Sequence, residues 1–140
     1  MGTMTEEKIN QYNENGERHG LWKSYYSNGQ LMSSYNYENG VLQGMSRWWY
    51  EANGQLSEEG EYVNGRKDGE WCYWNENGTV IREGSYKDGK EDGNWEFRFK
   101  NGKLWYLGSY VEGREHGVWR NWDEEGNEVK PSVYLHGILQ

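Results

Sequence analysis

The stretch Asn64-Gly65-Arg66-Lys67-Asp68-Gly69-Glu70-Trp71 decides the fold, because near copies of it recur along the whole chain. Its first glycine recurs as Gly16, Gly40, Gly89, Gly113 and Gly137, and its second as Gly20, Gly44, Gly93 and Gly117. The copies are 24 residues apart, or 25 where the second copy carries one additional residue. A fixed period of this length identifies a repeat protein in which each unit is one supersecondary element.

The composition favours strands. Only 34% of the 140 residues are hydrophobic and 27% are charged, which is little material for a globular core. Nine Trp, twelve Tyr and two Phe supply apolar area instead, since each large ring can bury roughly 150–250 Å². Disordered chains are poor in aromatic residues, and strands favour them, so the composition predicts an ordered all-β protein.

A further turn signal follows each copy of the stretch. It is Asn-Gly at Asn28-Gly29, Asn53-Gly54, Asn77-Gly78 and Asn101-Gly102, and Glu-Gly at Glu125-Gly126. Asn-Gly between two alternating runs predicts a hairpin with a two-residue type I′ turn, because that turn needs positive φ at both central residues. We therefore expect about five tandem β-hairpins, with about ten strands, in one elongated antiparallel meander sheet.

A two-residue turn would fix which residues face each other across each hairpin. Counting outward from the turns places Trp71 opposite Gly84, Trp95 opposite Gly108, Trp119 opposite Ser132 and Trp22 opposite Tyr35. A Trp laid across a strand glycine covers exposed backbone and fixes the register, so we expect Trp71 to cover Gly84. The structural repeat positions are Gly20, Gly44, Gly69, Gly93, Gly117, Trp22, Trp71, Trp95, Trp119, Tyr37, Tyr62, Tyr86, Tyr110 and Tyr134.

Two units depart from the pattern. In the second, Ser46 stands where other units have Trp, and Ala52 is an additional residue before Asn53, which predicts a bulge or a longer turn. In the last, Pro131 removes a ladder donor, which places its strand near an edge. We expect a tail or cap over residues 1–12, one repeat domain over residues 13–137 with units starting near Gly16, Gly40, Gly65, Gly89 and Gly113, and a truncated end over residues 138–140.

The repeated pattern resembles a known family. Tyr-x-Asn-Gly-x-x-x-Gly-x-Trp-x-x-Tyr/Trp, followed by Asn-Gly-x-Leu and a Glu-Gly step, is similar to the MORN repeat variant, and is clearest from Glu58 to Trp71 and from Arg82 to Trp95. The resemblance covers about residues 12–137 and implies a stack of hairpins in one long, twisted sheet. It also implies function: bacterial members are commonly labelled antitoxin-like, whereas eukaryotic members are associated with membrane lipid binding and scaffolding.

The residues give no support for catalysis, a cofactor or a metal. His19 and His116 lie four repeats apart and cannot share a metal ion. Adjacent carboxylates such as Glu58-Glu59 point to opposite faces of a strand, so they read as solvated charge. The glycines lack the lysine and serine of a phosphate-binding loop, and Cys72 lacks an activating partner. We expect a protein that is not an enzyme.

The charge limits the partners. The formal net charge of −8 opposes binding to nucleic acid and to anionic membranes, and attracts a basic protein. Cys72 is the single cysteine, so no disulfide forms within the chain, and neither a long apolar run nor a signal pattern is present. These features favour a cytoplasmic setting.

The face opposite Trp71 carries the candidate binding residues. The same count from the turns pairs Tyr25 with Met32, Trp74 with Ile81, Arg98 with Trp105 and Trp122 with Val129, which makes one stripe of aromatic and aliphatic side chains on that face. Such pairs stabilise a bare sheet, and they also make a docking surface rich in Trp and Arg. The candidate partner-binding residues are Tyr25, Trp49, Trp74, Arg98, Trp105 and Trp122.

The sequence thus favours a protein-binding module, antitoxin- or immunity-like. It would dock a protein on the face of the sheet that carries this aromatic stripe, or associate with a second copy of itself. A basic toxin such as a nuclease would suit its charge. Two alternatives remain open at this stage: a lipid-binding or scaffolding role like that of eukaryotic MORN proteins, and carbohydrate binding through stacked Trp rings.

Overall fold

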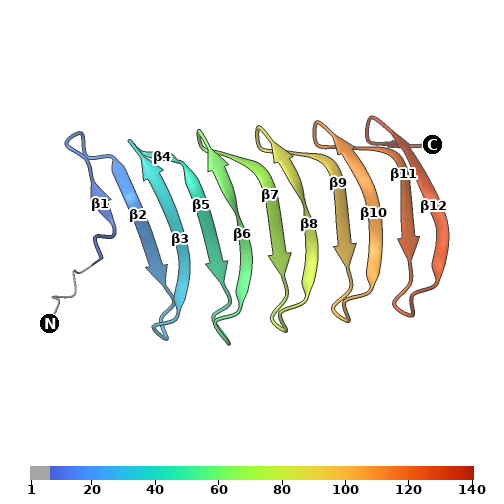
Figure 1. Cartoon of the computed structure of the whole chain (residues 1–140), viewed down its shortest axis with the longest axis horizontal. Helices are drawn as coiled ribbons and strands as arrows, with labels where there is room; N and C mark the ends of the chain where they lie inside the picture. The colour runs from blue at the N-terminus through green and yellow to red at the C-terminus, as the bar shows by residue number, and fades with distance from the viewer. Residues whose placement is uncertain (1–6) are drawn as a thin grey trace, which may run out of the picture.

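The computed structural model describes residues 7–140 as a single open sheet of antiparallel strands in one layer (Figure 1). The strands are β1 (Gln11–Tyr12), β2 (Arg18–Tyr25), β3 (Leu31–Glu38), β4 (Val41–Leu42), β5 (Gly44–Trp49), β6 (Leu56–Val63), β7 (Arg66–Trp74), β8 (Val80–Lys87), β9 (Lys90–Arg98), β10 (Leu104–Val111), β11 (Arg114–Trp122), β12 (Glu128–Leu135) and β13 (Ile138–Leu139). The described residues contain no helix long and apolar enough to cross a membrane.

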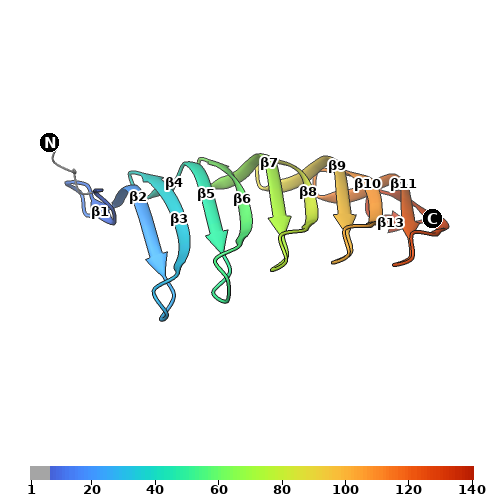
Figure 2. The ribbon, with the colours of Figure 1, turned by 60° about the horizontal axis from the view of Figure 1, so that its bottom comes forward.

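Sequence neighbours are also spatial neighbours in the sheet, which confirms the predicted meander of tandem hairpins. The order runs from β1 to β13 without a crossover, and only the short β4 lies off this path, paired with β3. Five long hairpins stand side by side, and no second layer of backbone covers either face of the described residues (Figure 2). Two short strands, β1 and β13, pair with the outermost hairpins, and β1 lies in the segment expected to form a tail or cap.

The predicted type I′ turns inside the hairpins are wrong, and that turn type is found instead at the junctions between hairpins. Asn64 and Gly65, which join one hairpin to the next, have φ of 51° and 81° and form the two-residue type I′ turn. At the Asn-Gly turns inside the hairpins only the glycine has positive φ, as Gly78 shows, and Asn75 N–H bonds Thr79 C=O across a three-residue loop. This is a type I turn followed by a glycine bulge, which uses the same Asn-Gly pair with one more residue.

The register is correct in the middle of each hairpin and shifts by one beside the turn. Trp71 faces Gly84, Trp95 faces Gly108, Trp119 faces Ser132 and Trp22 faces Tyr35, as predicted. Closer to the turn a bulge adds one residue, so Trp74 pairs with Val80 instead of Ile81. The additional residue of the second unit lengthens its turn, where Tyr50 N–H bonds Gln55 C=O, which confirms the predicted irregularity.

Trp71, Trp95 and Trp119 each cover a glycine of the preceding hairpin, not the residue that each faces across its own hairpin. A Cβ placed on Gly60 would overlap the indole of Trp71, and one placed on Gly84 would overlap the indole of Trp95. The expectation that Trp71 covers Gly84 is therefore wrong, because the indole leans back onto the preceding hairpin. There Trp71 Nε1 donates a hydrogen bond of 3.1 Å to Glu61 C=O, which satisfies the polar atom of a nearly fully buried side chain.

In the second unit, a small residue stands at the position of the Trp and a large residue at the position of the glycine. Where the three following units have Trp over Gly, Ser46 is buried and bonds Gly60 C=O, and Tyr35 takes the place of the glycine on the preceding strand. Trp48, two residues further along β5, packs edge-on against the Tyr35 ring and donates its indole N–H to the Tyr35 hydroxyl. At this place in the sheet a small residue, Ser46, thus packs against a large one, Tyr35, instead of a large Trp against a small Gly. The exchange keeps the space filled.

We predict that Gly84→Ala destabilises the fold by about 1–3 kcal/mol, because the new methyl group overlaps Trp95 and Gly84 itself has no unusual φ. Ser132→Ala is the matched control, since Ser132 occupies the same place in the last hairpin and carries no indole. Chemical denaturation measures both. Ser46 and Tyr35 show that a small residue can replace the Trp where a larger one replaces the glycine. The double variant Gly84→Ala/Trp95→Ser should therefore lose less free energy of unfolding than the sum of the losses in the two single variants. Strictly additive losses would contradict this account of the packing.

Candidate functional site

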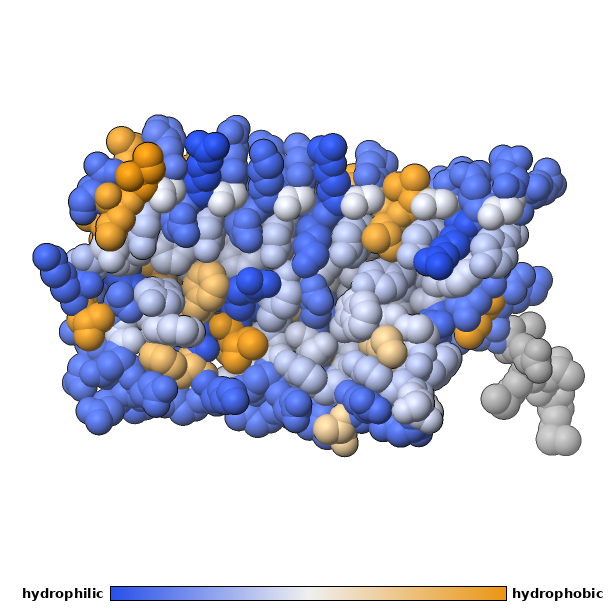
Figure 3. Space-filling view, turned by 180° about the vertical axis from the view of Figure 1, so that it is seen from behind, coloured by the Kyte–Doolittle hydropathy of each residue, from blue (hydrophilic) through white to orange (hydrophobic). Residues whose placement is uncertain are grey.

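The two faces of the sheet differ in chemistry. One, the aromatic face, carries the structural Trp and Tyr residues, and an unbroken series of ring contacts with centroids 5.0–6.5 Å apart joins Tyr12 at one end to Tyr134 at the other. Figure 3 views this face and shows the near-neutral rings as a pale band between hydrophilic margins. Trp71 and Trp95, which are 1% and 0% exposed, lie at its centre, so the sheet builds its core within one face.

Polar atoms are buried with the rings on this face. Burial raises the pKa of the Tyr110 hydroxyl to about 12 and that of Tyr35 to about 12, so both remain protonated at neutral pH. In the middle of the face the Tyr73 hydroxyl lies 2.9 Å from that of Tyr86 and accepts a hydrogen bond from Lys67 Nζ. Tyr73, Tyr86 and Lys67 thus form one hydrogen-bonded network among the rings.

Cations of the chain itself lie over the rings. Lys67 Nζ is 4.4 Å from the Trp71 ring centroid and 3.0 Å from Glu58 Oε1, and Arg82 lies 4.0 Å from the Tyr73 centroid. A cation held against an aromatic face in this way contributes roughly 0.5–2 kcal/mol, depending on how far it is desolvated. The middle of the aromatic face is therefore already occupied by partners from within the protein.

The opposite face, which we call the acidic face, carries a row of directly paired residues across the sheet. Register partners connect, in order, Arg47, Glu59, Cys72, Glu83, Glu96, Leu107 and Arg120. Carboxylates occupy the centre of the row and arginines its ends. Glu83 and Glu96 face each other directly, and Glu70 stands one position along β7 on the same face, where it accepts a hydrogen bond from Ser85 Oγ.

Ion pairs neutralise the margins of this face and Glu96, but they leave Glu70 and Glu83 unpaired within the described residues. Arg47 pairs with Glu59 at 2.6 Å, Arg98 with Glu96 at 3.0 Å, and Arg120 with Glu128 at 2.9 Å. Within the described residues, no ion pair reaches Glu70 or Glu83. A shallow hollow of about 470 Å³ lies here, lined by Glu70, Glu83 and Glu96 together with Asn94, Val118 and Arg120.

Most of the candidate binding residues lie on this face, beside the acidic row. Trp49, Trp74, Arg98 and Trp122 each follow a residue of the row by two positions on their strand, and Tyr25 follows Lys23 in the same way. The pairs across the hairpins are Tyr25 with Leu31, Trp49 with Leu56, Trp74 with Val80, Arg98 with Leu104 and Trp122 with Glu128. The aromatic-aliphatic stripe therefore exists, but the partners predicted for Tyr25, Trp74, Arg98 and Trp122 are wrong by one residue.

Trp105 leaves the stripe altogether. It is the additional residue of the bulge in β10, between Leu104, which faces Arg98, and Tyr106, which faces Phe97. Its ring stacks on Phe99 at 5.0 Å and lies 4.9 Å from Tyr106, so it belongs to the aromatic face, where it is 41% exposed. Bulges redirect side chains in this way, and a count from the turn cannot locate them.

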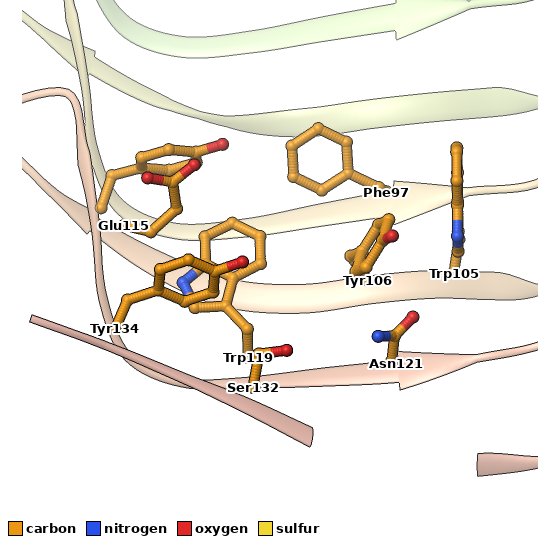
Figure 4. A pocket seen from close by; sticks show the side chains of 9 residues that line it. Phe97, Trp105, Tyr106, Glu115, Trp119, Asn121, Ser132 and Tyr134 are labelled. Atoms are coloured by element: carbon orange, nitrogen blue, oxygen red, sulfur yellow. The ribbon is translucent and has the colours of Figure 1, made fainter. Parts of the chain in front are cut away.

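The last hairpin leaves a hollow of about 370 Å³ on the aromatic face, which sequence reasoning missed. It is lined by Phe97, Trp105, Tyr106, Tyr110, Glu115, Trp119, Asn121, Ser132 and Tyr134 (Figure 4). The signal was present at Asn121, which stands where the two preceding hairpins carry Phe97 and Tyr73. Among residues 7–140 no three His, Cys, Asp or Glu side chains gather as a metal site.

Comparison with family models agrees with this geometry. The model described as the MORN repeat variant matches residues 18–39, 42–64, 67–88 and 91–112, which is more than half of the chain. The chain belongs to the MORN repeat variant family. The fifth hairpin, β11–β12, lies outside the matched residues and nevertheless pairs in the same register from Gly117 to Trp119, with its bulge one residue earlier along β11. No match was found among curated proteins.

We predict that Cys72 resists alkylation. Burial, reinforced by the nearby Glu83 carboxylate, raises the pKa of the Cys72 thiol from 9.0 to about 11. At pH 8 the thiolate fraction should then be about 100-fold lower than in the unfolded chain, and iodoacetamide labelling should slow accordingly. The raised pKa favours the neutral thiol in the folded state, so its contribution to stability is complete below pH 9 and is lost as the pH rises towards 11. Equal labelling rates for folded and unfolded protein would contradict this environment.

Proposed function

We propose that this MORN protein is a non-enzymatic protein-binding module, antitoxin- or immunity-like, whose acidic face docks a basic protein partner. The observation that carries the proposal is that Glu70 and Glu83 line one hollow of the acidic face and, within the described residues, have no ion-pair partner. Arg98 balances Glu96, which faces Glu83 directly, but neighbouring like charges without a counter-ion, such as Glu70 and Glu83, destabilise a sheet, by roughly 0.2–1 kcal/mol for a pair. The free protein thus keeps an arrangement that works against its own stability and that a bound cation would relieve.

The charge of the whole chain supports the same partner. With a net charge of −8 the molecule attracts basic proteins at long range, and a focused acidic patch orients them on approach. Arginines at the two ends of the row, Arg47 and Arg120, limit the acidic region to the centre of the face. A basic toxin is therefore a suitable partner, and masking its cationic surface would inhibit it if that surface binds nucleic acid.

The stripe beside the acidic row supplies apolar contact. Trp74 and Trp122 are half-buried, so each exposes part of a large ring next to the carboxylates. Arg120 lies 4.8 Å from the Trp122 ring centroid, which holds that ring in place. Trp residues within a polar surround are the residues that most often dominate binding energy in protein interfaces.

We predict that Glu83→Gln raises the stability of the free protein by about 0.2–1 kcal/mol and weakens partner binding, because it removes the like-charge contact that the partner relieves. The partner candidates are the products of the genes adjacent to its own, co-expressed and measured by isothermal titration calorimetry at two salt concentrations. Glu112→Gln, an exposed change in a junction turn, is the matched control and should alter neither quantity. Binding that is unaffected by salt and by Glu83→Gln would overturn the assignment of the acidic face.

We further predict that Trp74→Ala and Trp122→Ala each reduce affinity for that partner by about tenfold or more. Trp105→Ala is the matched control, because the bulge places that exposed ring on the other face. If the two stripe variants bind as well as the parent protein, the stripe is not part of the interface. Binding to anionic vesicles or to glycans in place of a protein would favour the lipid or carbohydrate alternatives instead.

A further inference from the structure

We propose that the hollow in the last hairpin binds an alkylammonium group, the side chain of a lysine or methylated lysine on a protein partner, between Trp119 and Tyr134 and against the carboxylate of Glu115. This site lies on the aromatic face and is independent of the docking surface on the acidic face. The argument comes from comparing the same positions in successive repeats, where the protein supplies the bound cation itself.

In two earlier hairpins a basic residue four positions before the repeat Trp lies between that Trp and the Tyr of the same hairpin. Arg18 is 4.6 Å from the Trp22 centroid and 5.5 Å from that of Tyr37. Lys67 is 4.4 Å from the Trp71 centroid and 5.2 Å from that of Tyr86. The Trp-Tyr pair of a hairpin therefore forms a cation-binding cleft, and these hairpins fill it from within.

In the last hairpin the same position carries the opposite charge. Glu115 stands four residues before Trp119 and pairs across the ladder with Tyr110, and Trp119 and Tyr134 keep the edge-on arrangement of the earlier pairs, with centroids 6.3 Å apart. Figure 4 shows Glu115, Trp119 and Tyr134 side by side at one end of the hollow. Within the described residues no cation lies over the Trp119 ring.

The fourth hairpin shows that the acidic residue alone does not leave a site. Glu91 takes the same position before Trp95, but Arg82 reaches that indole from the neighbouring hairpin, 5.6 Å from its centroid. The residue equivalent to Arg82 one repeat later is Tyr106, an aromatic wall of the hollow. Among the hairpins of residues 7–140, only the last has a carboxylate at this position and no cation over its repeat Trp, which is 6% exposed.

The size and lining of the hollow suit one ammonium group better than a larger ligand. Asn121, in place of Phe97 or Tyr73, leaves a volume of about 370 Å³, at the small end of the range for ligand sites. Rings of Phe97, Tyr106 and Trp105 continue the aromatic wall away from Glu115. Several rings around one carboxylate recognise an alkylated cation by its charge and its apolar surface together.

The test uses three peptides that differ only at one central residue: lysine, N-trimethyllysine, and the neutral analogue norleucine. Binding is followed by NMR through the indole N–H signal of Trp119, assigned with a Trp119→Phe variant, and affinities come from calorimetry. Tetramethylammonium chloride is the minimal probe and separates recognition of the cation from recognition of a peptide. We expect both ammonium peptides to bind about tenfold or more tightly than the norleucine peptide and to shift the Trp119 signal.

The decisive variant is Glu115→Lys, which gives the last hairpin the residue that Lys67 supplies in the third. It should fold, fill its own cleft and lose about tenfold or more in affinity for the ammonium peptides. Glu91→Lys is the matched control, with the same charge change one repeat earlier, and should change affinity by less than about twofold. If Glu115→Lys does not fold, Glu115→Gln is measured instead, and its affinity for the ammonium peptides should be several-fold lower than that of the parent protein. Equal binding of the norleucine peptide, unchanged affinity in the Glu115 variants, or no binding of any ammonium probe would overturn the proposal.

Discussion

The contact of Trp71, Trp95 and Trp119 with a glycine of the preceding hairpin is the interaction on which the rest of the structure depends. A one-layer sheet has no second layer to bury its side chains, so its apolar area must be buried within a face. Trp71 achieves this by lying flat over Gly60 and donating its indole N–H to Glu61 C=O. The bare backbone of the glycine gives the ring room, and the ring shields that backbone from water. The Tyr rings then pack edge-on against the sides of each indole.

The sequence predicted the fold because its signals are short-range and repeated. Glycine spacing gave the unit, and alternation between turn signals gave the strands, so neither depended on distant contacts. The predictions that were wrong concern local geometry, where one sequence pattern is compatible with two arrangements. Asn77-Gly78 is compatible with both a two-residue and a three-residue loop, and the additional residue displaced the partners of Trp74 and redirected Trp105. Trp71 faces Gly84 by register but lies over Gly60, because register does not state which way an indole leans.

The candidate sites were harder to predict than the fold, for a related reason. The acidic row joins residues from seven strands across junctions that contain bulges at residues such as Gly69 and Gly93, and the sequence does not show those offsets. Each carboxylate in it looked like ordinary solvated charge when taken alone. The hollow of the last hairpin arises from an absence of bulk at Asn121, which becomes visible only when equivalent positions are superposed through the repeat.

The Trp-glycine contact also has a direction. The indole always belongs to the later hairpin and the glycine to the earlier one, from Trp71 on Gly60 to Trp119 on Gly108. The glycine backbone of such a hairpin is therefore covered by the hairpin that follows it in the chain, not by the one before it. During synthesis, each of these glycines would leave the ribosome uncovered and be covered by the Trp that follows 11 residues later, so that assembly advances in the order of translation. The direction of these contacts along the sheet thus matches the direction in which the chain is synthesised.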